Sequence, residues 1–408
     1  MHPDLLYLDT ARVGRMSRSA QAAHLDYARL ATDEGGSLFF ERFLRQGVDS
    51  SPAKIHEFYP GLATWRGIGQ LKHSLRALAS GRRDLPVLLA NRCAALMRFA
   101  SRLLFHPCRN VLVTDLGWPA YHSILEAEAQ RASRSVTTVH ICQAILSRHL
   151  TEDELIQRLR NEFLDQGCDG LFLSAVSNLG VRLPVERIVR AIEATSEVRL
   201  IVIDGAQDFC HASSDLRNEY SDLYLAGSHK WLKAHHPMGV AFYGKRRSSS
   251  FIETGLDHLL ATGELDDPLL RFSRQLETCS LDGTSETVSL ASLFSCQGAA
   301  NDILSDIEYS AHGLAQLVNT SDAAADVARV SGWYPLRPEA SFRSGILLLE
   351  AEKAATKLAS AEALRSGFYE KGIALTAYDN GIIRLSVPEH GWKPGDLDRL
   401  GGALQSIF

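Results

Sequence analysis

The sequence predicts an α/β protein with a mostly parallel central sheet flanked by helices, followed by a smaller α+β unit. Short β-type runs alternate with helical patterns through the middle of the chain, as expected for parallel strands joined by crossover helices. One run, at residues 170–178, is almost continuously apolar, which is typical of a strand buried on both faces. Beyond about residue 290 the chain turns to helical stretches with few β-type runs, which indicates a second unit.

Each element has its own signal. Strands of the central sheet are expected at residues 110–115, 136–141, 170–178, 200–207, 223–228 and 239–244. Between the second and third of these, Thr151 and Glu154 form a capping box that opens an amphipathic helix. Pro184 opens the next helix, at a position where a missing amide proton costs little. Two later runs, 344–351 and 381–388, supply strands for the smaller unit.

The composition excludes several classes of function. The 408 residues carry a formal net charge of -5 and show no basic stripe, so no nucleic acid and no anionic membrane surface is expected as a partner. No apolar window approaches the roughly 18 residues of a membrane span, and the first residues lack the features of a secretory signal. The seven cysteines are widely spaced and include no C-x-x-C pair. We therefore expect a cytoplasmic protein with reduced thiols and no metal site.

An aspartate and a lysine follow two of the expected strands and point to one cofactor. Asp204 ends an apolar run, and Lys230 comes just after the next run. Open α/β folds bind their ligands at this carboxyl edge of the sheet. Pyridoxal phosphate needs an amine for its aldehyde and an anionic partner for its ring nitrogen. The pair predicts a pyridoxal 5'-phosphate site, although an isolated aspartate or lysine is more often a turn or surface residue.

Longer motifs around this pair resemble a known family. They are D-G-A-Q at residues 204–207, S-H-K-W-L at 228–232 and V-S-N-L-G-V-R-L-P at 176–184. Over nearly its whole length the chain resembles the class V aminotransferase family of fold-type I pyridoxal-phosphate enzymes, which includes cysteine desulfurases, kynureninases and isopenicillin N epimerase-like proteins.

The resemblance implies the fold-type I domain organisation. Residues 59–288 would form the large cofactor-binding α/β domain and residues 289–408 the small α+β domain. Residues 1–58 would contribute to the small domain and to the mouth of the active site, because Y-L-D-T-A-R at residues 7–12 resembles the opening strand of the family.

The same resemblance assigns roles around the cofactor ring. Lys230 would carry the cofactor as a Schiff base and, once the substrate amine displaces it, remove the Cα proton. Asp204 would keep the ring nitrogen protonated, and Gln207 would bond the region of the ring oxygen. Trp118 stands where the family has a ring-stacking residue, often a histidine; a buried structural tryptophan is the alternative.

Three residues are expected to bind the substrate. Asn178 and Arg384 match positions that hold the α-carboxylate in the family, and a planar guanidinium can grip a carboxylate with two parallel hydrogen bonds. Arg12 stands where relatives have a small residue near the substrate entrance. A fixed cation there suits a substrate with a second anionic or strongly polar group, and a surface arginine without function is the alternative.

A further set is implied for the cofactor phosphate and its surroundings. Residues 90–97 fall where the family has a loop that opens a helix, whose free amide protons bind phosphate. Residues 282–287 resemble a loop that reaches the phosphate of the neighbouring subunit, which implies a homodimer with a shared active site. Capping, turn or packing roles are the alternatives. The residues concerned are Asn91, Arg92, Cys93, Ser228, His229 and Thr284.

Departures from the family bear on the reaction. Cysteine desulfurases place a nucleophilic cysteine shortly before the carboxylate-binding arginine, whereas no cysteine follows Cys296 here, so that persulfide chemistry is not expected. We expect an enzyme that deprotonates an α-amino acid at Cα, first of all for β-elimination from an S-substituted cysteine-like substrate. The close alternative is an aminotransferase; an epimerase or a non-catalytic binding homologue are further ones.

Overall fold

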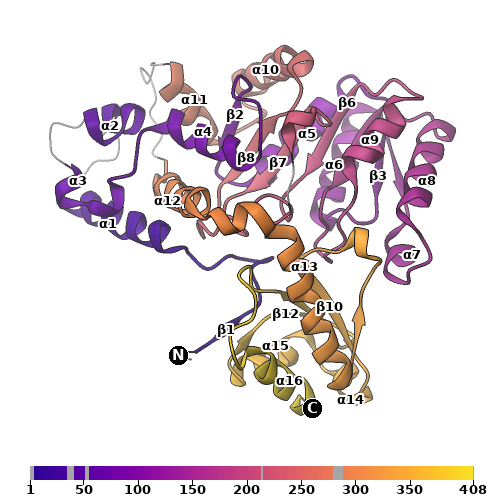
Figure 1. Ribbon diagram of the computed structural model, residues 1–408. Coiled ribbons are helices and arrows are strands. Elements are labelled where there is room, and N and C mark those ends of the chain that lie inside the picture. The colour runs from indigo at the N-terminus through magenta and orange to yellow at the C-terminus, as the bar shows by residue number, and fades with distance from the viewer. Residues whose placement is uncertain (1–3, 35–40, 51–54, 213–214, 279–287, 408) are drawn as a thin grey trace.

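A seven-stranded sheet forms the centre of the computed structural model, which describes residues 4–34, 41–50, 55–212, 215–278 and 288–407 (Figure 1). The strand order is β2-β8-β7-β6-β5-β3-β4. From β7 to β4 all neighbours are parallel, whereas β8 runs antiparallel to β7 and to β2. The predicted mostly parallel sheet is thus confirmed. The strands are β2 (Val87–Ala90), β3 (Asn110–Thr114), β4 (Ser135–Val139), β5 (Gly170–Ser174), β6 (Leu200–Asp204), β7 (Leu223–Gly227) and β8 (Gly239–Tyr243).

Helices cover both faces of this sheet, which is why its central strands are apolar throughout. Along β6, Ile201 and Ile203 belong to one hydrophobic cluster, while Leu200 and Val202 belong to the cluster on the opposite face. The capping box predicted at Thr151 is present at the start of its helix. The covering helices are α5 (Cys93–Phe105), α6 (Pro119–Ala132), α7 (Cys142–Leu146), α8 (Glu152–Asp165), α9 (Val185–Glu193), α10 (Arg246–Ala261) and α11 (Pro268–Thr278).

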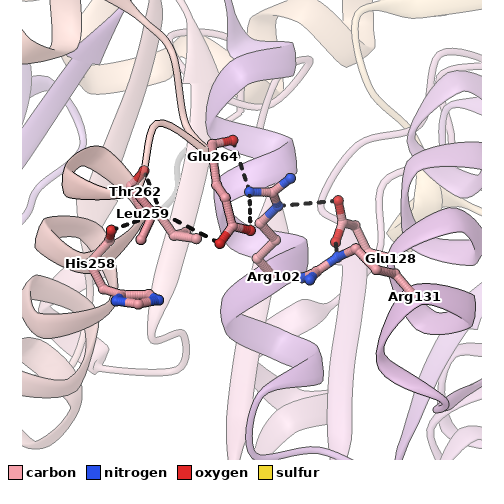
Figure 2. A network of polar contacts seen from close by, with 7 residues as sticks. All are labelled: Arg102, Glu128, Arg131, His258, Leu259, Thr262 and Glu264. Atoms are coloured by element: carbon pink, nitrogen blue, oxygen red, sulfur yellow. Dashed lines mark hydrogen bonds and ion pairs between the residues drawn. The ribbon is translucent and has the colours of Figure 1, made fainter.

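An ion-pair network ties α5 to its neighbours (Figure 2). Arg102 of α5 reaches Glu128 of α6 at 3.3 Å and Glu264, just after α10, at 3.0 Å. Arg131 binds the other oxygen of Glu128 at 2.7 Å. Because Arg102 and Glu128 are largely buried, these contacts hold α5 more firmly than exposed pairs would. The network fixes the helix whose first turn reaches the site described below.

Five helices, four from residues 18–78 and one from residues 291–305, contribute to one core with the large sheet. They are α1 (Arg18–Glu34), α2 (Glu41–Gln46), α3 (Ile55–Phe58), α4 (Ile68–Leu78) and α12 (Ala291–Ser305). Helix α12 contacts both α1 and α4, and Phe294 stacks on Tyr27 and meets the edge of Trp65. Residues far apart in sequence therefore share one core here.

The smaller unit is built on an antiparallel sheet ordered β12-β13-β10-β9. Its strands are β9 (Trp333–Leu336), β10 (Ile346–Ala351), β12 (Thr376–Tyr378) and β13 (Ile382–Ser386), and its helices are α13 (Ile307–Val330), α14 (Ala354–Leu358), α15 (Ala361–Glu370) and α16 (Asp396–Ser406). Strands were predicted at the positions of β10 and β13, and both are confirmed.

The first described residues and the C-terminal helix α16 both lie in the small unit (Figure 1). Strand β1 (Leu6–Tyr7) pairs in parallel with β11 (Ile373–Ala374), and Leu6 and Leu8 enter the small unit's core. Helix α1, by contrast, packs in the core of the large sheet. The domain boundaries at residues 58 and 288 stay predictions.

Two properties of the described residues concern the protein's surroundings. None of their helices combines the length and the apolar character needed to cross a membrane. Six of the cysteines lie in the described part, and none of the six forms a disulfide.

Candidate active site

A cavity of about 480 Å³ opens at the carboxyl ends of β5, β6 and β7. Such a volume is within the usual range for cofactor and small-molecule sites. Its wall also takes residues from the N-terminal segment, the starts of α5 and α6, and β13. The structure brings most of the predicted residues together there: Arg12, Arg92, Cys93, Trp118, Asn178, Asp204, Gln207, His229, Lys230 and Arg384.

Asp204 is the buried acid of the cavity. It ends β6 with its side chain 5% exposed and accepts hydrogen bonds from the Ala206 amide at 2.9 Å and the Ser174 hydroxyl at 3.5 Å. Burial raises its pKa, against these bonds and the positive charge of Lys230. A buried carboxylate with few partners is suited to a cationic or N–H ligand group, because such a partner offsets the cost of its burial.

Lys230 follows β7 and lies in the cavity wall, where its backbone is in close contact with Gly14. Its Nζ has no hydrogen-bond partner among the described residues, and burial lowers its pKa, which favours the neutral amine. The Gly14 amide donates to the His229 carbonyl at 2.7 Å. A side chain at Gly14 would meet the Lys230 carbonyl at 2.0 Å, so only glycine allows the N-terminal segment to lie against the lysine.

Gln207 connects the cavity to two other segments. Its Nε2 donates to the Ala11 carbonyl at 2.7 Å, and its Oε1 accepts from the Trp231 indole at 2.9 Å. Trp231 stacks on His211 with ring centroids 3.7 Å apart. The side-chain amide of Gln207 has a second N–H that is left for a ligand. Below, the part of the cavity formed by Lys230, Asp204 and Gln207 is called the ring end.

His211 extends this framework to the small sheet. Its Nε2 accepts from the Gly345 amide at 2.9 Å, and its Nδ1 lies 2.6 Å from the Gln207 carbonyl, so the neutral ring carries its proton on Nδ1. Burial lowers the pKa of His211 to about 4. The residues that support Gln207 are therefore neutral and fixed at physiological pH.

Arg384 enters from β13 and is almost fully buried at 4% exposure. Its Nη1 donates to the Asn178 carbonyl at 3.1 Å and its Nη2 to the Thr376 hydroxyl at 3.1 Å. Asp9 lies 3.5 Å from Nη2. The buried Nε has no partner among the described residues. An unsatisfied guanidinium N–H in a cavity wall is a site for an anionic ligand group.

The N-terminus of α5 forms what we call the phosphate end, with Arg92 and Cys93. Arg92 is the N-cap residue and is exposed, with no hydrogen bond from its side chain among the described residues. A side chain at Gly239 would lie 2.7 Å from the Arg92 carbonyl carbon, so glycine lets this turn pack on β8. Burial raises the pKa of Cys93 to about 12, so its thiol is neutral.

His229 joins the wall between the two ends. Burial, with the charge of Lys230 beside it, lowers its pKa to about 4, and its Nδ1 has no partner among the described residues. A neutral imidazole with an open ring nitrogen can bind a ligand there but carries no charge for a phosphate at neutral pH.

Two predicted residues, Ser228 and Asn91, are not brought to the cavity, and a third lies outside the described residues. The Ser228 hydroxyl bonds the His236 and Met238 carbonyls at 3.0 and 3.4 Å, away from the site. The backbone amide of Asn91 donates to the Asp267 carboxylate, and Asn91 does not line the cavity. Thr284 lies outside the described residues. The roles given to these three residues stay predictions without support from the geometry.

Some wall residues were missed in the sequence. Tyr121, 9% exposed, lines the cavity beside Trp118, and its position in the quoted stretch D-L-G-W-P-A-Y at residues 115–121 could have indicated it. Trp118 itself is the N-cap residue of α6, lines the cavity and is 47% exposed. Asp9 and Thr376, which contact Arg384, are separated by most of the chain, and no local pattern could have paired them.

The residues present fit pyridoxal phosphate. The donor set combines an unbonded lysine amine, a buried carboxylate and the first turn of a 13-residue helix with an arginine beside it. The amine suits the cofactor's aldehyde, the carboxylate suits its ring nitrogen, and the helix N-terminus with its arginine suits its phosphate. The orphaned Nε of Arg384 leaves a further place for a carboxylate.

Comparison with known proteins identifies a family and similar structures. The model of the family described as aminotransferase class-V matches residues 90–309. A probable cysteine desulfurase from Vibrio cholerae is 33% identical over 86 residues, which is 21% of this chain. The match spans one fifth of that relative's length (20%), so activity does not follow from it.

Solved structures share the fold over the whole chain. A cystine C-S lyase, C-DES, in complex with its product cysteine persulfide has a TM-score of 0.72 at 15% identity, covering 99% of this chain and 98% of that one. The cysteine desulfurase CsdA from Escherichia coli has 0.68 at 14%, covering 100% and 95%. An aspartate aminotransferase from Thermus thermophilus has 0.64 at 15%, covering 98% of each.

At these identities the structures establish the architecture alone, which is the predicted fold-type I one. The family model covers more than half of the 408 residues and includes both Asp204 and Lys230. The chain therefore belongs to the class-V aminotransferase family.

Proposed function

We propose that this family member is a pyridoxal-phosphate-dependent enzyme that removes the Cα proton of an α-amino acid and eliminates a sulfur substituent from its β-carbon. The observation that carries the proposal is the meeting of Lys230, Asp204 and Arg384 in one cavity. Lysine and aspartate suit the cofactor, and the open guanidinium donor suits the carboxylate of an amino acid.

The protein's own residues then have defined tasks. Bound pyridoxal phosphate supplies an aldehyde for amines and a ring that accepts the electrons released at Cα. Asp204 would hold the ring nitrogen and keep it protonated. Arg384 and Asn178 bind the substrate carboxylate. The Lys230 amine, whose pKa burial lowers, takes the Cα proton.

Elimination is proposed because of a residue that the sequence lacks and of the acid-base residue that remains near the ring. No cysteine follows Cys296, which argues against persulfide formation on a loop near Arg384. Trp118 in the place of a histidine leaves Lys230 as the main acid and base near the ring. A cystine C-S lyase among the similar folds is consistent with this choice. An aspartate aminotransferase and a ureidoglycine-glyoxylate aminotransferase also share the fold, with TM-scores of 0.64 and 0.67, so amino transfer is the second candidate.

Two further proposals concern the oligomeric state and the cellular location. A homodimer with a shared active site is supported by the family's phosphate loop at residues 282–287, which lie outside the described part. A cytoplasmic location is supported by the sequence pattern of unpaired, widely spaced cysteines.

A direct test uses the purified enzyme with added cofactor. Wild type is expected to show a visible absorbance band of bound cofactor, and Lys230→Ala to lose the covalent band and at least about a thousandfold in turnover. Lys233→Ala, three residues on, serves as the matched control. A wild-type protein that binds no cofactor would contradict the proposal.

Product analysis separates the candidate reactions. Pyruvate, ammonia and free thiol from S-substituted cysteines indicate elimination. A keto acid with one equivalent of pyridoxamine phosphate indicates amino transfer and would replace elimination as the function.

A further inference from the structure

The guanidinium of Arg384 is held by two residues from distant parts of the chain. Nη2 donates to the Thr376 hydroxyl at 3.1 Å and lies 3.5 Å from the Asp9 carboxylate. The Thr376 hydroxyl in turn donates to the same carboxylate oxygen of Asp9. Asp9 and Arg384 are 8% and 4% exposed. A buried, connected network of this kind restricts the orientation of its members.

Asp9 cannot follow a displaced guanidinium, because the backbone on both sides of it is fixed. The Leu8 amide donates to the Ala374 carbonyl at 2.8 Å, and the Ser386 amide donates to the Leu8 carbonyl at 2.8 Å. The carbonyl of Asp9 accepts the amides of Arg12 and Val13 at 2.9 and 3.1 Å. The carboxylate is thus set against β12 and β13 by hydrogen bonds that do not involve its side chain.

The arrangement leaves Arg384 a defined set of open donors. A guanidinium has five N–H groups, and two are taken by Asn178 and Thr376. The Nε proton has no partner among the described residues. Two parallel bonds to a carboxylate require one particular edge of the guanidinium plane, so a rotation of the plane would lose them.

We propose that Asp9, together with Thr376, is a positioning residue that orients Arg384 to receive the α-carboxylate of the substrate. The inference rests on the proposed function, because it assumes that Arg384 binds that carboxylate. An arginine side chain loses conformational entropy when it is fixed. The network fixes Arg384 already in the free enzyme, so this loss does not weaken substrate binding.

A second role for Asp9 predicts the opposite result and makes the inference testable. If Asp9 served only to neutralise the cation, its removal would strengthen the attraction between Arg384 and a substrate carboxylate, and KM would fall. If Asp9 orients the guanidinium, its removal weakens the bidentate contact, and KM rises.

The test compares wild type with Asp9→Asn, which keeps the side-chain volume, using the amino acid that wild type turns over fastest. We expect KM to rise about tenfold, as for loss of one charge-assisted hydrogen bond, with kcat changed less than about threefold. Thr376→Val should shift KM in the same direction, and Thr376→Ser, which retains the hydroxyl, should restore it. An unchanged or lower KM in Asp9→Asn overturns the inference.

A binding experiment gives a readout independent of turnover. The probes are 2-aminoisobutyrate, which has no Cα proton, and isopropylamine, which lacks its carboxylate; each is titrated by the absorbance of the bound cofactor. The variant should weaken the acid about tenfold and leave the amine unchanged. An equal change for both probes, or for neither, contradicts the orientation of Arg384 by Asp9.

Failure of the inference can be told from failure of the proposed function. A protein without cofactor absorbance, or an Arg384→Ala variant with normal KM, overturns the function itself. A normal cofactor band and a raised KM in Arg384→Ala, with no change in Asp9→Asn, overturn the inference alone. Thermal unfolding of each variant shows that the comparison is made on folded protein.

Discussion

The two ends of the cavity differ in how they depart from the family. At the ring end, Lys230, Asp204 and Gln207 all line the wall as the motifs predict. At the phosphate end, the Ser228 hydroxyl donates to backbone carbonyls instead, and Asn91, whose backbone amide donates to Asp267, does not line the cavity. Ring-end side chains come from the ends of β6 and β7 or the turn after them, whose direction the sheet fixes. Phosphate-end side chains lie in loops, where single local hydrogen bonds decide the orientation.

The difference leads us to propose that Arg92 and the amides at the start of α5 bind the cofactor phosphate. At this end the described part of the cavity offers Arg92, the neutral Cys93 and the amides of α5. A guanidinium binds phosphate by charge and by paired N–H groups. Substitution of the ring-end residues should therefore lower turnover, as the family resemblance implies. At the phosphate end, substitution of the residues that the resemblance implies, Ser228 and Asn91, should have little effect on cofactor binding.

The largest effect is expected at the ring end. Asp204→Asn removes the charge that keeps the cofactor ring protonated, so turnover should fall at least about a hundredfold, with a changed absorbance spectrum. Asp208→Asn is the control, because Asp208 is as buried but binds the Tyr224 hydroxyl at 2.6 Å and does not line the cavity. Equal losses in both variants would mean that burial of an acid, not its place in the cavity, matters.

A smaller effect should separate the residues of the phosphate end. Arg92→Ala should raise the dissociation constant of pyridoxal phosphate by about ten- to a hundredfold and leave that of pyridoxal, which lacks the phosphate, unchanged. Ser228→Ala and Asn91→Ala should leave both constants within about threefold. The measurement is a fluorescence or absorbance titration of the apoenzyme. A strong effect of Ser228→Ala would restore the family's phosphate contact and remove the contrast between the two ends.

The smallest effect is expected at the cavity entrance. Arg12 is exposed, lines the cavity and has no side-chain hydrogen bond among the described residues. If it reads a second anionic group, Arg12→Gln should lower kcat/KM about tenfold for substrates with such a group and leave neutral ones unchanged. A uniform change over both classes would make Arg12 a surface residue of the entrance. Arg15→Gln, nearby but over the Tyr7 ring, is the matched control.

The accuracy of the sequence-based predictions follows the range of the interactions involved. Strands β3 to β8 and the capped helix α8 were predicted because their signals, apolar runs and a capping box, are local. Lys230 and Asp204 were found because each directly ends or follows such a run. The contact of Asp9 with Arg384 joins segments at opposite ends of the chain, and only the folded topology shows it. The turned-away hydroxyl of Ser228 depends on two carbonyls of its own loop, which no motif encodes.

The parallel pairing of β1 with β11 has a consequence for the synthesis of this protein. Leu6 and Tyr7 find their strand partner only when Ile373 and Ala374, far along the chain, have emerged from the ribosome. The large sheet can form earlier, but the partners of Leu8 and Asp9 in the small unit, Ala374, Thr376 and Ser386, are made only later. Such sequence-distant contacts are slow to form, since a long loop must close first. A nascent or truncated chain ending before residue 372 would therefore hold a nearly complete large core with an unfinished site.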